Sequence, residues 1–355
     1  MLNRSTVVAA LLAFASSAAA QYPAPEQGNF VVKDFRFRSG ETMPELRIHY
    51  RTVGTPERDA AGVVRNAVLV MHGTGGTGAQ FIRAEFAGEL FRSGGLLDAA
   101  RYYIILPDGI GHGQSSKPSD GLRAKFPHYG YLDMIEAEYR LVTEGLGVNH
   151  LRLVMGTSMG GMHTWLWGER YPDFMDALMP LASLPTQISG RNRVWRRTII
   201  DAIRNDPAWH GGNYSTQPPS LRTAEEILFL MSSNAVIRQR DLPTLAAGDR
   251  RLDEAIASTL KEDDANDVLY QIDASRDYDP GPDLENIRAP LLAVNSADDL
   301  INPPELGILE REIKRVSRGR AVVVPQSPET RGHGTHTIAK VWKAYLQELL
   351  TASAR

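Results

Sequence analysis

The sequence contains no cysteine among its 355 residues. This absence excludes disulfide bonds, thiolate metal sites and cysteine nucleophiles together. Neither sign of charge is in excess, because 39 Lys and Arg residues stand against 42 Asp and Glu residues. Nucleic-acid-binding proteins usually carry a basic surplus, so no nucleic-acid partner is expected. The H-E-x-x-H pattern and other metal-ligand spacings are also missing, so neither a metal nor another cofactor is expected.

Long hydrophobic runs are missing too, and the first short one lies near the N-terminus. Arg4 precedes an apolar run over Val7–Ala15, and small residues lead to Ala20. A positive end, a compact apolar stretch and small residues are typical of a signal peptide. The run is well short of the roughly 20 apolar residues that span a bilayer. The sequence therefore predicts a signal peptide over residues 1–20, export to the periplasm or the extracellular medium, and no membrane span.

The rest of the chain alternates strand-like and helix-like segments. Residues 21–28 predict a loose arm, and two extended runs after Asn29 predict a β-hairpin around residues 39–41. Short runs that are apolar on both faces then predict strands of a buried parallel sheet. These runs are 67–73, 102–109, 151–158, 177–183, 290–296 and 321–325. Helical patterns between them predict an α/β fold with a doubly wound, mostly parallel sheet.

One interval, residues 185–288, contains no buried-strand run but several amphipathic helical patterns. We interpret it as a helical lid insertion over the carboxyl edge of the sheet, where open α/β folds bind ligands. The core domain is then predicted to comprise residues 29–184 and 289–355.

The strongest chemical signal is the pattern Gly-x-Ser-x-Gly over residues 156–160, between a predicted strand and a predicted helix. Small residues on both sides permit a tight turn that lifts the hydroxyl of Ser158 above the edge of the sheet. The helix N-terminus then faces a developing oxyanion. This context predicts that Ser158 is a nucleophile.

A serine nucleophile needs a base, and the base needs an orienting acid. In this architecture an acid follows a later strand, and a histidine lies near the C-terminus. Asp298 and Asp299 follow the strand-like run 290–296, and we favour Asp299 because of its spacing to a following proline. His333 and His336 follow the last strand-like run, and we favour His333 because His336 begins the final helix. Asp298 and His336 remain the alternatives.

A glycine-rich segment over residues 73–78 follows the first core strand. A backbone N–H from this segment, together with that of Met159, is expected to form an oxyanion hole. Thr74 is the favoured donor and Gly75 the alternative. No Gly-Lys-Ser/Thr ending follows, so the segment is not a phosphate-binding loop.

Several segments of the chain resemble the homoserine O-acetyltransferase-like branch of the α/β-hydrolase superfamily. They are LRIHYRTVGTP, GTSMGGMHTWLWGERYPD, WRRTIIDAIRNDPAWHGGNY, DANDVLYQIDASRDYD, NSADDLINPPE and RGHGTHT. The resemblance covers residues 29–350 and implies an α/β-hydrolase fold with Ser158, Asp299 and His333 as nucleophile, acid and base. It also implies a homodimer that forms through the lid, as in many relatives.

Two departures from these relatives bear on the substrate. Gly334 stands where the biosynthetic acetyltransferases place an Asp that contacts the amino-acid substrate, and Glu225 and Glu226 lie near the place of their substrate-binding Arg. We therefore predict an exported serine hydrolase that cleaves a neutral, small-molecule carboxylic ester through an acyl-Ser158 intermediate. The alternatives are an O-acyltransferase with acetyl-CoA as donor and a non-catalytic binding protein.

Overall fold

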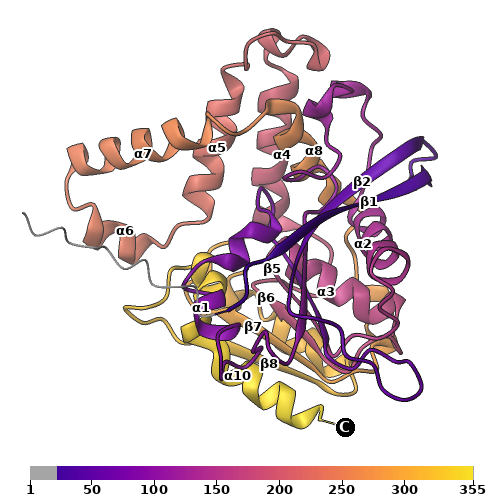
Figure 1. Cartoon of the computed structure of the whole chain (residues 1–355). Coiled ribbons are helices and arrows are strands. Elements are labelled where there is room, and N and C mark those ends of the chain that lie inside the picture. The colour runs from indigo at the N-terminus through magenta and orange to yellow at the C-terminus, as the bar shows by residue number, and fades with distance from the viewer. Residues whose placement is uncertain (1–21, 355) are drawn as a thin grey trace, which may run out of the picture.

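The computed structural model describes residues 22–354, so the predicted signal peptide lies outside the described residues. The strands are β1 (Glu26–Arg36), β2 (Thr42–Val53), β3 (Ala67–Met71), β4 (Tyr103–Pro107), β5 (Leu153–Thr157), β6 (Leu178–Leu181), β7 (Leu291–Ser296) and β8 (Gly319–Val324). They form one sheet with the order β1-β2-β4-β3-β5-β6-β7-β8 (Figure 1). Strands β3 to β8 run parallel, whereas β2 is antiparallel to both of its neighbours.

The central strands are buried on both faces. Every residue of β3, β4, β5, β6 and β7 is buried, which explains why these segments are apolar without alternation. The prediction of a doubly wound, mostly parallel α/β sheet is confirmed.

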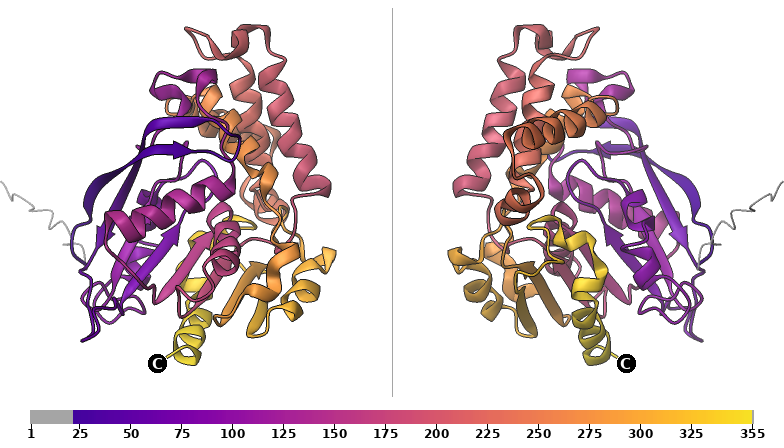
Figure 2. Two further views of the ribbon diagram at one scale, coloured as in Figure 1. Left: turned by 90° about the vertical axis from the view of Figure 1, so that its right-hand side faces the viewer. Right: turned by 90° about the vertical axis from the view of Figure 1, so that its left-hand side faces the viewer.

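Helices cover both faces of this sheet (Figure 2). Side chains of α2 and α3 belong to the core on one face, and side chains of α1 and α10 belong to the core on the other face. The helices are α1 (Ala87–Leu90), α2 (Tyr131–Arg140), α3 (Met159–Arg170), α4 (Gly190–Arg204), α5 (Ser220–Met231), α6 (Ala235–Asp241), α7 (Leu245–Thr259), α8 (Ala265–Asp273), α9 (Ile308–Glu312) and α10 (Ala339–Ala352). No helix within residues 22–354 has the length and apolar character needed to cross a membrane.

The N-terminal hairpin begins earlier than the sequence predicts. Residues 26–28 already belong to β1 and pair with β2, so the predicted loose arm is wrong for these three residues. Gly28 lies opposite Tyr50, and a Cβ at Gly28 would lie 2.5 Å from the Tyr50 hydroxyl oxygen. The absence of a side chain at Gly28 thus lets β1 pass beside an aromatic ring of β2.

Between β6 and β7 the chain forms α4, α5, α6, α7 and α8, which stand together at one end of the sheet (Figure 1). The amphipathic pattern over 223–237 is divided between α5 and α6, because the side chain of Asn234 caps α6 by accepting from the N–H of Ile237 at 2.9 Å.

Candidate active site

Ser158 occupies the sharp turn between β5 and α3. Its backbone has φ 56° and ψ −111°, a conformation that residues other than glycine rarely adopt. A Cβ on Gly156 would lie 2.2 Å from the carbonyl oxygen of Gly160, and one on Gly160 would lie 2.0 Å from that of Met71. Both glycines are therefore needed for the chain to turn this tightly, and the turn places Ser158 directly before the N-terminus of α3.

Asp299 and His333 follow the ends of β7 and β8 and come together with Ser158. The Nε2 atom of His333 lies 2.8 Å from Ser158 Oγ, and its Nδ1 atom lies 2.8 Å from Asp299 Oδ2. With the ring proton on Nδ1, His333 donates to Asp299 and accepts from the serine hydroxyl. The three side chains thus form a continuous hydrogen-bonded relay, in which His333 Nε2 can accept the serine proton.

The carboxylate of Asp299 is fully buried but well supplied with donors. Its Oδ1 accepts from the N–H of Ile301 at 2.8 Å and from that of Asn302 at 3.1 Å. Burial acts to raise the pKa of Asp299, but His333 and these two N–H groups outweigh it and hold the pKa below its usual value. Asp299 therefore stays ionised and can stabilise a protonated His333.

Asp298, the alternative acid, makes different contacts. Its Oδ2 accepts from the N–H of Gly332 at 3.0 Å and contacts the hydroxyl of Thr330 at 2.9 Å. It also contacts Asn234 and Ser296. Asp298 therefore fastens the loop that carries His333, and the histidine ring itself is held by Asp299.

We expect Asp299→Asn to lower kcat for ester cleavage by about 10⁴-fold, because the amide no longer fixes the Nδ1–H tautomer of His333. Asp298→Asn is the matched control, since it changes the adjacent carboxylate in the same way. It should lower the thermal midpoint while keeping kcat within about tenfold, because it weakens hydrogen bonds to the loop only. Steady-state kinetics on folded protein measure both effects. A larger kcat loss in Asp298→Asn would make Asp298 the acid.

His336, the alternative base, is half-buried beside His333, with the two ring centroids 5.2 Å apart. Burial lowers the pKa of His336 to about 3, and the neighbouring His333 adds to this effect. Within residues 22–354, its Nδ1 atom has no hydrogen-bond partner. The serine hydroxyl makes its hydrogen bond to His333, at 2.8 Å, and not to His336.

Thr74, Gly75 and Met159, the residues predicted to supply the oxyanion hole, all lie close to Ser158. Thr74 and Gly75 line the same cavity as Ser158, and Met159 begins α3. No backbone carbonyl in the described part of the chain accepts from the N–H of Thr74 or Met159. These N–H groups are therefore free to donate to an oxyanion.

A cavity of about 340 Å³ opens onto Ser158 and His333. Apart from Ser158, His333, the glycine-rich loop and Ile301, its walls come from the segment between β6 and β7, including Trp195, Arg196, Glu225, Leu228, Phe229, Ile256, Asp263, Val268 and Gln271. Helices α4, α5, α7 and α8 thus shape the space in front of the serine.

Besides the histidine of the relay, the walls of this cavity carry three ionisable side chains, Arg196, Glu225 and Asp263. That these three lie together was not predicted from the sequence. Arg196 is 3% exposed. Burial raises the pKa of Glu225 to about 7, with a further contribution from Asp263, whose own pKa is raised to about 6 by burial. The prediction of a neutral substrate rested on Gly334, Glu225 and Glu226. It did not consider Arg196, which places a buried cation in the same cavity.

Arg196 was detectable from the sequence. The run RNRVWRR resembles a solvated helix face, but Arg196 shares the spacing of the buried Ile199, Ile200 and Ile203. A side chain at this helical spacing faces the same side as the apolar residues.

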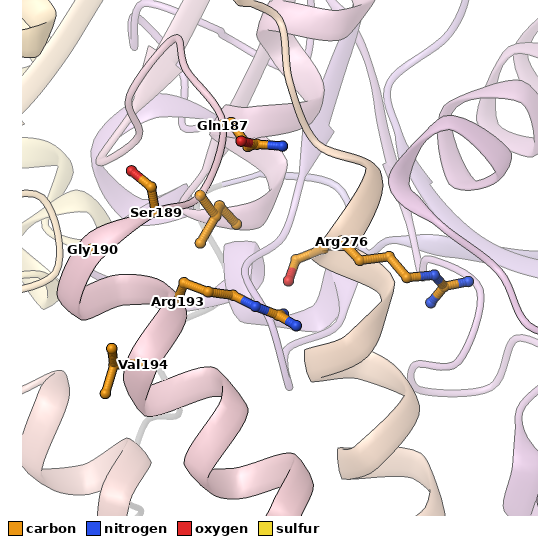
Figure 3. A pocket seen from close by; sticks show the side chains of 8 residues that line it. Gln187, Ser189, Gly190, Arg193, Val194 and Arg276 are labelled. Carbon is orange, nitrogen blue, oxygen red and sulfur yellow. The ribbon is translucent and has the colours of Figure 1, made fainter.

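A second hollow, of about 560 Å³, lies at the start of α4 (Figure 3). It is lined by Gln187, Ile188, Ser189, Gly190, Arg193, Val194, Ser275 and Arg276. The side chain of Arg276 points away from that of Arg193 and pairs with Asp273 at 3.2 Å. No member of the serine relay lines this hollow, so it is separate from the candidate active site.

His72 and His112 are buried in the loops after β3 and β4. The N–H of Gly109 donates to His72 Nε2 at 2.9 Å, and His72 Nδ1 donates to the carbonyl of Gly73 at 2.8 Å. His72 thus ties the two loops together. In the part of the chain that the structure describes, no group of three or more His, Asp or Glu side chains is arranged to hold a metal ion.

Comparison with known proteins places this geometry in a family. Residues 66–327 match the family of the alpha/beta hydrolase fold. A probable acyltransferase of Methanothermobacter thermautotrophicus is 31% identical over 278 residues, which cover 78% of this chain and 84% of that protein. A homoserine O-acetyltransferase of Haloarcula marismortui is 30% identical over 322 residues, which cover 78% and 77% of the two chains.

Among solved structures, esterase E22 superimposes with a TM-score of 0.80. The match covers 92% of this chain and 100% of the esterase at 18% identity. At this identity the likeness concerns the fold alone.

Proposed function

Because the chain belongs to the alpha/beta hydrolase fold family, in its homoserine O-acetyltransferase-like branch, we propose that it cleaves carboxylic esters through an acyl intermediate on Ser158. The observation that carries the proposal is the relay of two 2.8 Å contacts from Ser158 through His333 to Asp299. A hydroxyl, an imidazole and a buried carboxylate in this order are the parts needed for nucleophilic acyl transfer.

In the first half of the proposed reaction, Ser158 Oγ attacks the ester carbonyl while its proton passes to His333 Nε2. The carbonyl oxygen becomes an oxyanion, which accepts hydrogen bonds from the N–H groups of Met159 and of Thr74 or Gly75. Collapse of this intermediate breaks the bond to the alcohol, which leaves with the proton from His333. Asp299 remains ionised and stabilises the imidazolium throughout.

In the second half, water attacks the acyl-Ser158 ester as His333 accepts its proton. The carboxylic acid then leaves, and the proton returns to Ser158 Oγ. An alcohol attacking in place of water gives a new ester by the same steps, so hydrolysis and acyl transfer share one intermediate. Transfer, with acetyl-CoA as a donor, is the second candidate because of the 31% identity to a probable acyltransferase.

We expect the mature protein to convert short-chain aryl esters mainly to free acid, even when an alcohol acceptor is present. The measurement separates free acid from transferred ester after incubation with and without the acceptor. Ser158→Ala provides the blank. Acceptor-dependent product that exceeds the free acid would favour the acyltransferase, and no turnover of any ester or thioester would refute both.

A further inference from the structure

Arg196 is a buried cation without an anionic partner. Its guanidinium is held by two neutral oxygens, Asn192 Oδ1 at 2.9 Å and Ser275 Oγ at 3.2 Å, and it stacks over the ring of Trp195 at 4.6 Å. None of the ion pairs between residues 22–354 includes it. Burial accordingly lowers the pKa of Arg196. A buried charge in this state is unfavourable until an anion joins it.

The position of Arg196 connects it to the reaction centre. It lines the same cavity as Ser158, His333 and Thr74. Arg196, the glycine-rich loop and the candidate nucleophile therefore border one cavity.

The two carboxyl groups of the cavity do not neutralise Arg196. Glu225 comes from α5 and Asp263 follows α7, and neither forms an ion pair with Arg196 within the described chain. With pKa values of about 7 and about 6, both carboxyls keep part of their protons near neutral pH. The cation is thus the group in this cavity whose charge persists at every physiological pH.

We propose that Arg196 binds a carboxylate of the substrate, so that the site selects an ester carrying a free carboxylate over its neutral analogue. This inference rests on the proposed ester cleavage at Ser158. A guanidinium offers a planar fork of donors that matches a carboxylate, and the two neutral oxygens behind it fix the orientation of that fork.

The first test compares kcat/KM for matched anionic and neutral esters. The acyl-side pair is mono-4-nitrophenyl adipate against 4-nitrophenyl hexanoate, and the alcohol-side pair is 4-acetoxybenzoate against 4-acetoxybenzamide. We expect a preference of about tenfold or more for the anionic member of one pair, which corresponds to one hydrogen-bonded charge pair. Arg196→Met should bring that ratio close to one. Arg197→Met is the matched control, because Arg197 is exposed on the same helix and pairs with Asp201 at 2.6 Å.

Arg196→Lys distinguishes binding of a carboxylate by Arg196 from a purely structural role of its side chain. It keeps the charge without the fork and should recover part of the preference, whereas a structural role would lower turnover of both members equally and leave the ratio unchanged. Thermal melting confirms that each variant is folded. A preference that persists in Arg196→Met, or no preference in either pair, would overturn the proposal.

A second measurement separates this inference from the proposed function. Ser158→Ala is expected to bind esters without cleaving them, so its ligand affinities can be measured by titration calorimetry. The compared pairs are methyl hydrogen adipate with dimethyl adipate, and 4-acetoxybenzoate with 4-acetoxybenzamide. The anionic member of one pair should bind at least about tenfold more tightly, and Ser158→Ala/Arg196→Met should lose the difference. Equal affinities would refute the role of Arg196. Tight anion binding by a wild-type protein that cleaves no ester would instead refute the ester cleavage alone.

Discussion

Ser158→Ala is expected to lower kcat for ester cleavage by on the order of 10⁶-fold, because the acyl intermediate loses its attachment point. The hydroxyl contacts His333 at 2.8 Å, and losing this hydrogen bond should cost only about 1 kcal/mol of stability. Kinetics and thermal melting on the same preparation measure the two effects.

A fluorophosphonate probe provides a direct check on the same serine. The wild-type protein should be labelled at Ser158, and mass spectrometry of its peptides identifies the modified residue. If the probe labelled another serine in Ser158→Ala and that variant still cleaved esters, the assignment of Ser158 as the nucleophile would be contradicted.

His333→Ala is expected to be nearly as damaging, with kcat lowered by about 10⁵-fold or more, because the members of such a relay act as one unit. His336→Ala is the matched control, since it removes a neighbouring imidazole that is not hydrogen-bonded to Ser158 in the described chain. Despite the cavity it leaves, it should keep at least about a tenth of the activity. Reversed effects on kcat would make His336 the base.

The sheet and the hydrogen-bonded relay of Ser158, His333 and Asp299 could be predicted from the sequence, because parallel strands bring their carboxyl ends to one edge of the sheet. Ser158 follows β5, Asp299 follows β7 and His333 follows β8, so their order along the chain predicts their meeting in space. The choice between Asp298 and Asp299 needed three dimensions. The spacing to the following proline favoured Asp299, but consecutive residues after a strand point in different directions, and the contact with His333 appears only in the structure.

Two other features, the pairing of residues 26–28 in the sheet and the burial of Arg196, were not predicted from the sequence. Residues 21–28 were predicted to form a loose arm, whereas residues 26–28 pair with β2 and Gly28 lies opposite Tyr50. Arg196 lies in a run of charged residues of the kind that usually faces solvent, and its helical spacing to the buried isoleucines of α4 is the one sequence signal that places it on the buried face of that helix. For residues 26–28 the missing information is the pairing with another strand, which no pattern within the segment records.

The helical segment between β6 and β7, which contains α4 to α8, begins and ends at strands that pair directly in the sheet. The chain therefore leaves the sheet after β6 and returns to it at the adjacent strand β7, so the insertion has both of its ends at one place in the core. Ser158, Asp299 and His333 all lie outside this segment, whereas Arg196, Glu225 and Asp263 lie within it. Exchange of this segment between related chains is therefore expected to change the cavity in front of Ser158 while Ser158, Asp299 and His333 are retained, provided that the contact between Asn234 and Asp298 is kept.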